Sequence, residues 1–183
     1  MKHGIATVLT TGLLTIGAST AWTETLENDL VLATFDDNGL VSIHDKQLDE
    51  TLEFSGDYWS FVIEHHRVDS IYVPAKEYVP EPNGLRYFFR EGEFDVEVVY
   101  QLKPGWRFVT KQLFVTTRKT PVYTVRHMNV FHGRLDNRPK NIFTAGLDEK
   151  RSAVRGLGDY AAFVRMNDRW GGMFMMQNPF SVW

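Results

Sequence analysis

Carboxylates are concentrated in one short segment of the chain. They are Glu91, Glu93, Asp95 and Glu97. Alternate residues of a strand share a face, so these four side chains project together, opposite Phe94 and Val96. Two carboxylates flanking a glycosidic bond could act as acid and base. However, nothing in the segment buries one of them as a catalytic acid requires, so we interpret the row as a solvated strand face and assign no catalytic residue.

The histidines are not spaced like a metal site. His65 and His66 are consecutive, and the separation of His127 from His132 is odd, so the members of each pair project from opposite faces of a regular strand. An imidazole site needs two or three histidines around one ion. We predict no metal site and no cofactor. There is also no Gly-x-Ser-x-Gly elbow, and the glycines of residues 155–160 lack the spacing of a dinucleotide fingerprint.

Aromatic residues make up 14% of the chain. Carbohydrate sites combine ring faces with polar hydrogen-bonding groups, since sugars have both apolar and polar surfaces. The same rings at alternate strand positions would instead fill the core of a sandwich, and we expect most of them to do so. The candidate substrate-binding residues are Trp59, Trp106, Trp170 and Tyr160.

Residues 1–21 have the pattern of a signal peptide. Lys2 provides a basic start, residues 5–16 are apolar, and Ser19 and Ala21 are small residues at the −3 and −1 positions. The apolar run is shorter than the roughly 20 residues that span a bilayer. We therefore predict a secreted or periplasmic protein with no membrane association after removal of the signal. Residues 22–183 would form the mature chain.

Composition excludes several classes of protein. The net charge of −3 argues against a nucleic-acid-binding surface, which normally has a basic excess. The chain has no cysteine, so it has no disulfides, thiolate metal site or cysteine nucleophile. An exported protein without disulfides is more typical of bacteria than of a eukaryotic secretory pathway.

Beyond residue 22, the pattern indicates strands and turns. Apolar and polar residues alternate over residues 94–102, which predicts a half-buried strand. Lys103-Pro104-Gly105-Trp106 predicts a type II turn, with a second strand over residues 106–117. Asn38-Gly39 between apolar residues 30–35 and 40–43 predicts another hairpin. The remaining predicted strands cover residues 58–64, 70–73, 85–90, 122–131, 152–154, 160–166 and 172–177.

Short strands at regular spacing, without a helical apolar period, predict an all-β fold, an antiparallel β-sandwich. We expect one domain over residues 22–183. Because residues 173–183 are apolar where natural termini are usually polar, we also expect this domain to be a piece of a longer protein.

Three strings of the sequence are similar to a known family. They are residues 32–46 (LATFDDNGLVSIHDK), residues 98–113 (VVYQLKPGWRFVTKQL) and residues 177–180 (QNPF). They resemble the N-terminal region of secreted bacterial α-galactosidase-like glycoside hydrolases. The resemblance implies a galactose-mutarotase-like supersandwich, a galactoside or plant glycan as ligand, and a C-terminal catalytic barrel, missing here, as partner. Because the family's catalytic carboxylates lie in that barrel, none transfers to this chain.

The leading hypothesis is therefore an exported, carbohydrate-related β-sandwich domain without its own catalytic centre. A free-standing carbohydrate-binding module would expose a platform of Trp or Tyr rings. A mutarotase-type epimerase would require His127 or His132 to converge with a carboxylate in one pocket. A structural domain without a ligand is the remaining alternative.

Overall fold

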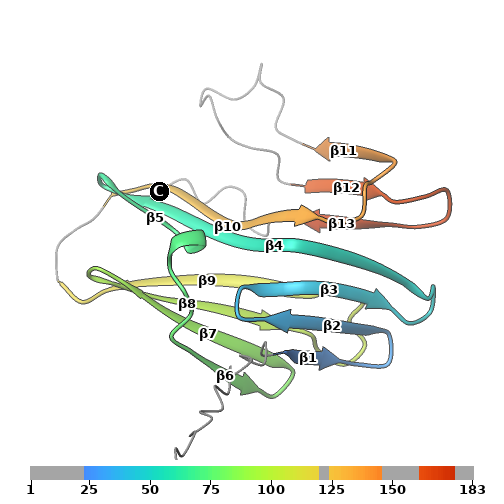
Figure 1. Ribbon diagram of the computed structural model, residues 1–183, viewed down its shortest axis with the longest axis horizontal. Coiled ribbons are helices and arrows are strands. Elements are labelled where there is room, and N and C mark those ends of the chain that lie inside the picture. The colour runs from blue at the N-terminus through green and yellow to red at the C-terminus, as the bar shows by residue number, and fades with distance from the viewer. Residues whose placement is uncertain (1–22, 120–123, 146–160, 176–183) are drawn as a thin grey trace, which may run out of the picture.

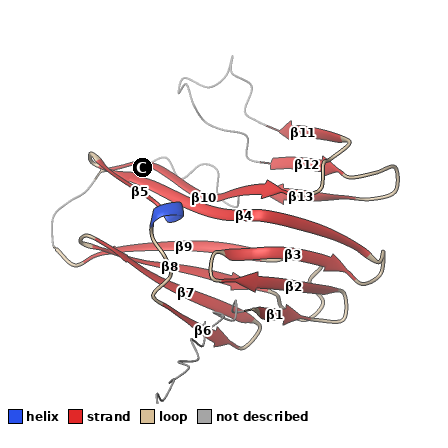
Figure 2. Ribbon diagram, viewed as in Figure 1, coloured by secondary structure: helices blue, strands red, loops and turns tan. Residues whose placement is uncertain are grey.

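The computed structural model describes residues 23–119, 124–145 and 161–175, and it is built almost entirely of antiparallel strands (Figure 1). One short 3₁₀ turn, η1 (Ser70–Tyr72), interrupts them (Figure 2). The strands are β1 (Glu24–Glu27), β2 (Val31–Asp36), β3 (Gly39–Asp45), β4 (Glu50–Ile63), β5 (His66–Asp69), β6 (Glu77–Glu81), β7 (Gly84–Glu91), β8 (Phe94–Gln101), β9 (Thr110–Thr117), β10 (Val125–Leu135), β11 (Asn141–Ala145), β12 (Ala161–Arg165) and β13 (Gly171–Met175).

The strands form three sheets. The first sheet has the order β1-β2-β3-β4-β10, with β5 also paired to β4, and the second has the order β6-β7-β8-β9. Their inner faces form one core, which confirms the predicted all-β antiparallel sandwich. The third sheet, β11-β12-β13, lies beside β4 and β10.

Alternation along the strands explains the core. In β8, the inward residues Phe94, Val96, Val98 and Tyr100 are buried. Each large apolar side chain removed from water contributes about 1.5–3 kcal/mol. The largest fully buried side chains are Trp59, Tyr87, Phe35, Phe61, Leu85 and Leu102. Most of the aromatic residues that the structure describes on these strands therefore serve packing.

Both predicted turns form. Gly105 has a φ of 77°, and the N–H of Trp106 donates to the carbonyl of Lys103 at 3.1 Å, as a type II turn requires. Gly39 has a φ of 116°, whereas Asn38 keeps a negative φ. Strand β9 begins at Thr110 rather than at the predicted residue 106. Its pairing with β8 starts at Thr110, opposite Gln101, and residues 106–109 form no pairs with β8.

Other predictions were wrong. Residues 70–73 are not a strand, because Asp69 caps η1 by accepting a hydrogen bond from the N–H of Ile71 at 3.3 Å. Strands β1, β5, β6 and β11 and the first half of β4 were not predicted. The predicted strand at residues 152–154 lies outside the described residues.

The third sheet extends the core at one end. Phe174 contacts Phe54 and Phe131, with ring centroids 6.1 and 5.5 Å away. On its other face, Phe143, Phe163 and Met173 lie side by side across the three strands and are about half exposed. Among the described residues, no helix is long and apolar enough to span a membrane.

Candidate ligand site at a split in the first sheet

Along part of one edge of β4, none of the described strands is paired with it. On this edge, Glu50–Glu53 pairs with β3 and residues 60–63 pair with β5. The opposite edge is occupied by β10 over residues 54–63. Between β3 and β5, residues 54–59 therefore face a gap within the described part of the sheet. We call this gap the split.

A bulge in β4 determines which side chains line the split. Before it, Leu52 and Phe54 point inward; at the bulge, Gly56 and Asp57 are both buried; beyond it, Trp59 points inward. The pairing with β10 shifts opposite this point, between Arg134 and Leu135. One extra residue in a strand reverses its alternation. Asp57 is thereby turned into the core.

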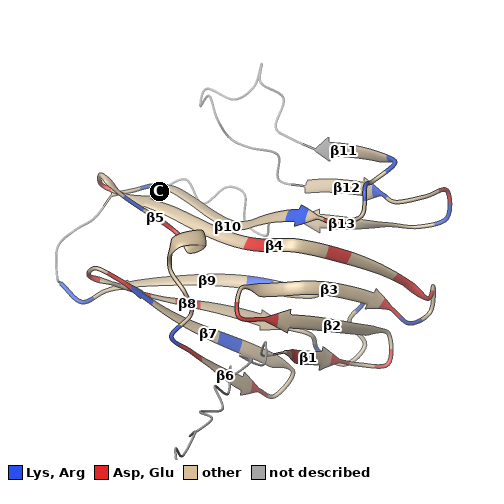
Figure 3. Ribbon diagram, in the orientation of Figure 1, with Lys and Arg blue, Asp and Glu red and all other residues tan. Residues whose placement is uncertain are grey.

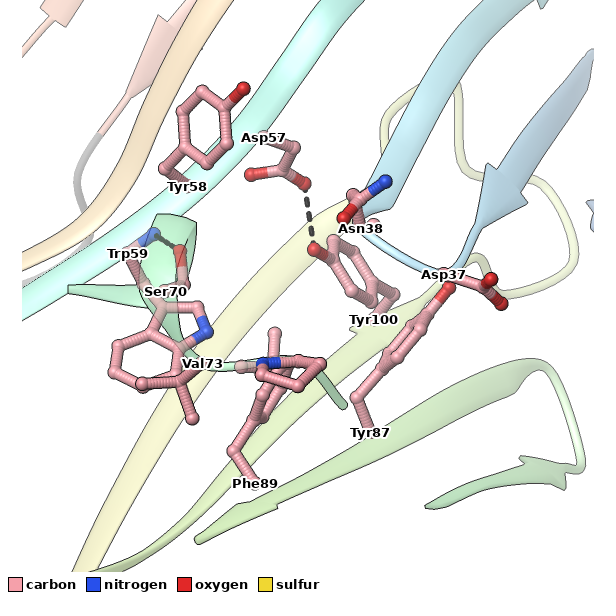
Figure 4. Close-up of a pocket in the computed structure, with 13 residues that line it drawn as sticks. Asp37, Asn38, Asp57, Tyr58, Trp59, Ser70, Val73, Tyr87, Phe89 and Tyr100 are labelled. Carbon is pink, nitrogen blue, oxygen red and sulfur yellow. Dashed lines mark hydrogen bonds between the residues drawn. The ribbon is translucent and has the colours of Figure 1, made fainter. Parts of the chain in front are cut away.

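Side chains replace the missing strand at both ends of the split. The carboxylate of Asp57 accepts a hydrogen bond from the backbone N–H of Leu40 at 3.2 Å. The hydroxyl oxygen of Ser70 accepts one from the backbone N–H of Trp59 at 2.9 Å (Figure 4). These bonds satisfy backbone donors that would otherwise be unpaired in a half-buried position.

Asp57 also ties the two sheets together. Its carboxylate forms an ion pair with Lys111 of β9. The same carboxylate accepts a hydrogen bond from the hydroxyl of Tyr100 of β8 at 2.6 Å (Figure 4). The Asp57 side chain is fully buried and that of Lys111 is 9% exposed. Lys111 Nζ also lies 5.6 Å from the ring centroids of Tyr100 and Phe131. A buried carboxylate is tolerated here because it has three donors.

Burial shifts the pKa values of the ionisable groups around Asp57. Burial raises the pKa of Tyr100 well above its ordinary value, and the neighbouring negative charge of Asp57 raises it further. Burial lowers the pKa of Lys111, although the ion pair with Asp57 opposes this change. Burial likewise raises the pKa of Tyr87, whose hydroxyl donates to the carbonyl of Asp36 at 2.8 Å. Both phenols therefore remain hydrogen-bond donors at neutral pH.

Two adjoining cavities occupy the split. The outer groove has a volume of about 320 Å³ and the inner pocket about 20 Å³, and they share Asn38, Asp57 and Tyr58. The outer groove is lined by Asp36, Asn38, Leu40, Val41, Phe54, Ser55, Gly56, Asp57, Tyr58 and Ile71. The inner pocket adds Asp37, Gly39, Trp59, Ser70, Val73, Pro74, Tyr87, Phe89, Val98 and Tyr100.

The rim combines polar and apolar groups. Asp37 and Asn38 are exposed in the β2–β3 turn. Ile71 of η1 lines the groove and is 56% exposed, and its neighbour Tyr72 is 83% exposed. Carboxylate, amide and hydroxyl groups beside apolar side chains suit a small neutral ligand with many hydroxyls.

The structure separates the predicted sugar-contacting residues. Trp59 is 2% exposed, packs on Phe61 and Phe89, and lines the inner pocket. Trp106 is half-buried in the loop before β9, where Phe108 stacks on it at 4.6 Å and Lys103 Nζ lies 4.9 Å from its ring centroid.

Trp170 is half-buried and packs against the core at the start of β13, and Tyr160 lies outside the described residues. Of the candidates that the structure describes, only Trp59 therefore lines the split.

Several residues at the split were not predicted from the sequence to belong to a functional site. Asp57, Tyr100 and Lys111 come from three strands, and no local spacing connects them. Asn38 was recognised only as a turn residue. The one available signal was Ser55-Gly56-Asp57, which interrupts the apolar alternation of β4 and can indicate a bulge.

The acidic segment is a surface of ion pairs. Asp95 pairs with Arg90 at 2.8 Å, and Glu97 pairs with Arg86. Glu93 pairs with Lys119 at 3.2 Å. Figure 3 shows many charged residues in turns and at strand ends, as expected for solvated positions. Since the side chains of Glu93, Asp95 and Glu97 are 18%, 35% and 34% exposed, the row is a set of half-buried ion pairs rather than the fully solvated face that was predicted.

The histidines do not converge. His127 and His132 are exposed on β10, and the ring of His132 lies edge-on to Tyr58 at 6.5 Å. Neither lines a cavity of the split. Within the described residues, no group of three or more His, Asp or Glu side chains could hold a metal ion.

Comparison with known proteins identifies no relative: no family model, curated protein or solved structure matches this chain.

Proposed function

We propose that this chain is an exported, carbohydrate-related β-sandwich domain of an α-galactosidase-like protein, without a catalytic centre of its own. The split would bind a galactoside or related plant glycan. Residues 1–21 would direct export to the periplasm or the medium, and a C-terminal catalytic domain would be its partner. The proposed family rests on the resemblance of residues 32–46 and 98–113 described above.

The outer groove is the observation that carries the proposal. It combines a volume of about 320 Å³ with Asn38, Ser55 and Tyr58 as hydrogen-bonding groups. Small-ligand sites typically have volumes of roughly 300–1,000 Å³ with a few polar groups. Ile71, which is 56% exposed, adds an apolar side chain to the lining of the groove.

The carboxylates of the split do not support catalysis. A glycosidase acid must be kept protonated by apolar surroundings. Asp57 instead lies against the ammonium of Lys111, and Asp36 accepts a hydrogen bond from the backbone N–H of Asn38 at 2.7 Å. Asp37 is exposed to water. We therefore infer binding without turnover.

The alternatives differ in what they require. An epimerase would need a histidine beside a carboxylate in the pocket, whereas His127 and His132 lie exposed outside it. A free-standing carbohydrate-binding module remains a second candidate, because every described residue that lines the split comes from this domain and the site needs no other.

Isothermal titration calorimetry of the full chain with methyl α-galactoside tests the proposal. We expect saturable binding that Asn38→Ala weakens, because the variant removes a groove amide. Gln112→Ala is the matched control, since Gln112 is exposed on the second sheet away from the groove. An aryl α-galactoside should not be hydrolysed.

Two results would refute the proposal. Absence of heat of binding at millimolar methyl α-galactoside and at galactomannan oligosaccharides would remove the carbohydrate function. Hydrolysis of the aryl galactoside by the purified chain, at a rate that Asn38→Ala lowers, would show that the domain has a catalytic centre.

A further inference from the structure

Among the described residues, the indole N–H of Trp59 has no hydrogen-bond partner. Trp59 is 2% exposed, and no described residue accepts a hydrogen bond from its Nε1. A buried donor without an acceptor is costly, so such groups are rare in folded proteins, and an acceptor oxygen in an adjoining cavity would satisfy it. Trp59 lines the inner pocket (Figure 4).

The inner pocket can hold one oxygen atom. Its volume of about 20 Å³ exceeds the roughly 10–15 Å³ that a single water needs. The indole N–H can only donate, so the atom it faces must accept. Ser70 Oγ lines the same pocket and accepts from the backbone N–H of Trp59 at 2.9 Å. A hydroxyl group could therefore accept from Trp59 and donate to another lining oxygen.

The inner pocket adjoins the outer groove. Asn38, Asp57 and Tyr58 line both cavities, so a ligand in the groove lies next to the position facing Trp59. Asp57 is neutralised by Lys111, whereas Asp37 on the rim carries an unpaired negative charge among the described contacts. An anionic ligand is therefore disfavoured relative to a neutral one.

We propose that Trp59 is a specificity-determining residue whose indole N–H donates a hydrogen bond to a hydroxyl oxygen of a galactoside bound in the split, with that oxygen seated in the inner pocket. The inference rests on the proposed carbohydrate function and adds to it one atom-to-atom contact. The Trp59 ring is covered by Phe61 and Phe89 and is 2% exposed, so its face is not available to stack on a sugar. Trp59 therefore acts through its indole nitrogen.

Trp59→Phe tests this contact, since phenylalanine retains an aromatic ring against Phe61 and Phe89 but has no donor. In calorimetric titration with methyl α-galactoside, we expect affinity to fall by about five- to tenfold, the size of one hydrogen bond. Trp106→Phe, in the loop before β9, is the matched control and should leave the affinity unchanged. Circular dichroism and thermal melting check the fold of both variants.

A second readout does not depend on the variant folding. In ¹⁵N-labelled wild-type protein, addition of methyl α-galactoside should shift the indole Nε1–H cross-peak of Trp59 and leave that of Trp106 in place. If the wild type binds but Trp59→Phe binds equally well, or the Trp59 cross-peak does not move, this inference is wrong and the pocket holds water only. If the wild type does not bind, the proposed function itself fails, and this inference fails with it.

Discussion

At the scale of single residues, Asp57 and Lys111 form the polar centre of an otherwise apolar core. Their side chains are 0% and 9% exposed, and each comes from a different sheet. A buried ion pair adds little net stability, because desolvation offsets its attraction, but removal of one member leaves an uncompensated charge. The pair therefore fixes how β4 and β9 face each other.

Replacing Lys111 with methionine should lower the free energy of unfolding by about 3–5 kcal/mol, because Asp57 would stay buried without its counter-charge. The double variant Asp57→Asn/Lys111→Met should recover most of this loss, since the asparagine oxygen can still accept from Tyr100 and Leu40. Urea denaturation measures both. Equal stability of Lys111→Met and the wild type would show that Asp57 is not charged in the core.

The tyrosine beside this pair predicts a response to alkaline pH. The pKa of Tyr100 is raised above its ordinary 10.0 in the folded state, so above pH 10 the unfolded chain loses this proton first and stability falls as pH rises. The pKa of Lys111 is lowered from 10.5 in the folded state, so Lys111 makes stability rise with pH, but only below about pH 10.5.

Above pH 10.5, Tyr100→Phe should therefore flatten the fall in unfolding free energy by up to about 1.4 kcal/mol per pH unit, as followed by urea titrations at several pH values. Tyr87, whose pKa is also raised by burial, should leave a residual slope in the variant. Identical slopes in the two proteins would contradict the burial of the Tyr100 hydroxyl.

At the scale of elements, the sequence predicted those strands and turns that are determined by neighbouring residues. Alternation over residues 94–102 and the Pro104-Gly105 turn predicted β8 and its connection to β9. The same reasoning missed the first half of β4, because the bulge at Gly56 breaks the alternation on which strand prediction depends. Asp57 could not be predicted as a core residue, since its burial requires Lys111 and Tyr100 from distant strands.

The β2–β3 turn depends on Gly39 for two reasons. Its φ of 116° is unfavourable for any other residue, and a Cβ would lie 2.7 Å from Tyr100 Oη and 3.2 Å from Asp57 Oδ2. Gly39→Ala should therefore lower the free energy of unfolding by about 3 kcal/mol or more. Gly92→Ala, at a φ of 56° with nothing within 4 Å, should cost only about 1 kcal/mol. Denaturation curves showing equal losses would contradict the close approach of the turn to Asp57.

At the scale of the whole molecule, the pattern of strands and turns predicted the fold class but not the site. Strand-rich patterning and the absence of helical periods correctly indicated an antiparallel sandwich. Most aromatic residues were expected to fill the core, and four were kept as candidate sugar contacts; of these, Trp59 is buried and Trp106 is covered by Phe108 and Lys103. The split arises from the way β3 and β5 divide one edge of β4, and such long-range pairing leaves no local pattern in the sequence.

Export is a prediction about the whole chain that a direct measurement can check. If the chain is expressed in a bacterium, the signal-peptide pattern of residues 1–21 predicts that the exported protein begins at Trp22, after cleavage behind Ala21. N-terminal sequencing of the periplasmic and medium fractions measures this. An exported product that retains Lys2, or retention of the whole protein in the cytoplasm, would contradict the prediction.

The central claim is that the split binds a carbohydrate. The most direct test is a backbone amide chemical-shift map of the ¹⁵N-labelled chain titrated with methyl α-galactoside. We predict that the shifts cluster in residues 37–40, 56–59 and 70–73, which meet at the split from three separate parts of the sequence. Shifts confined to residues 103–108 around Trp106, or no shifts at saturating ligand, would contradict it.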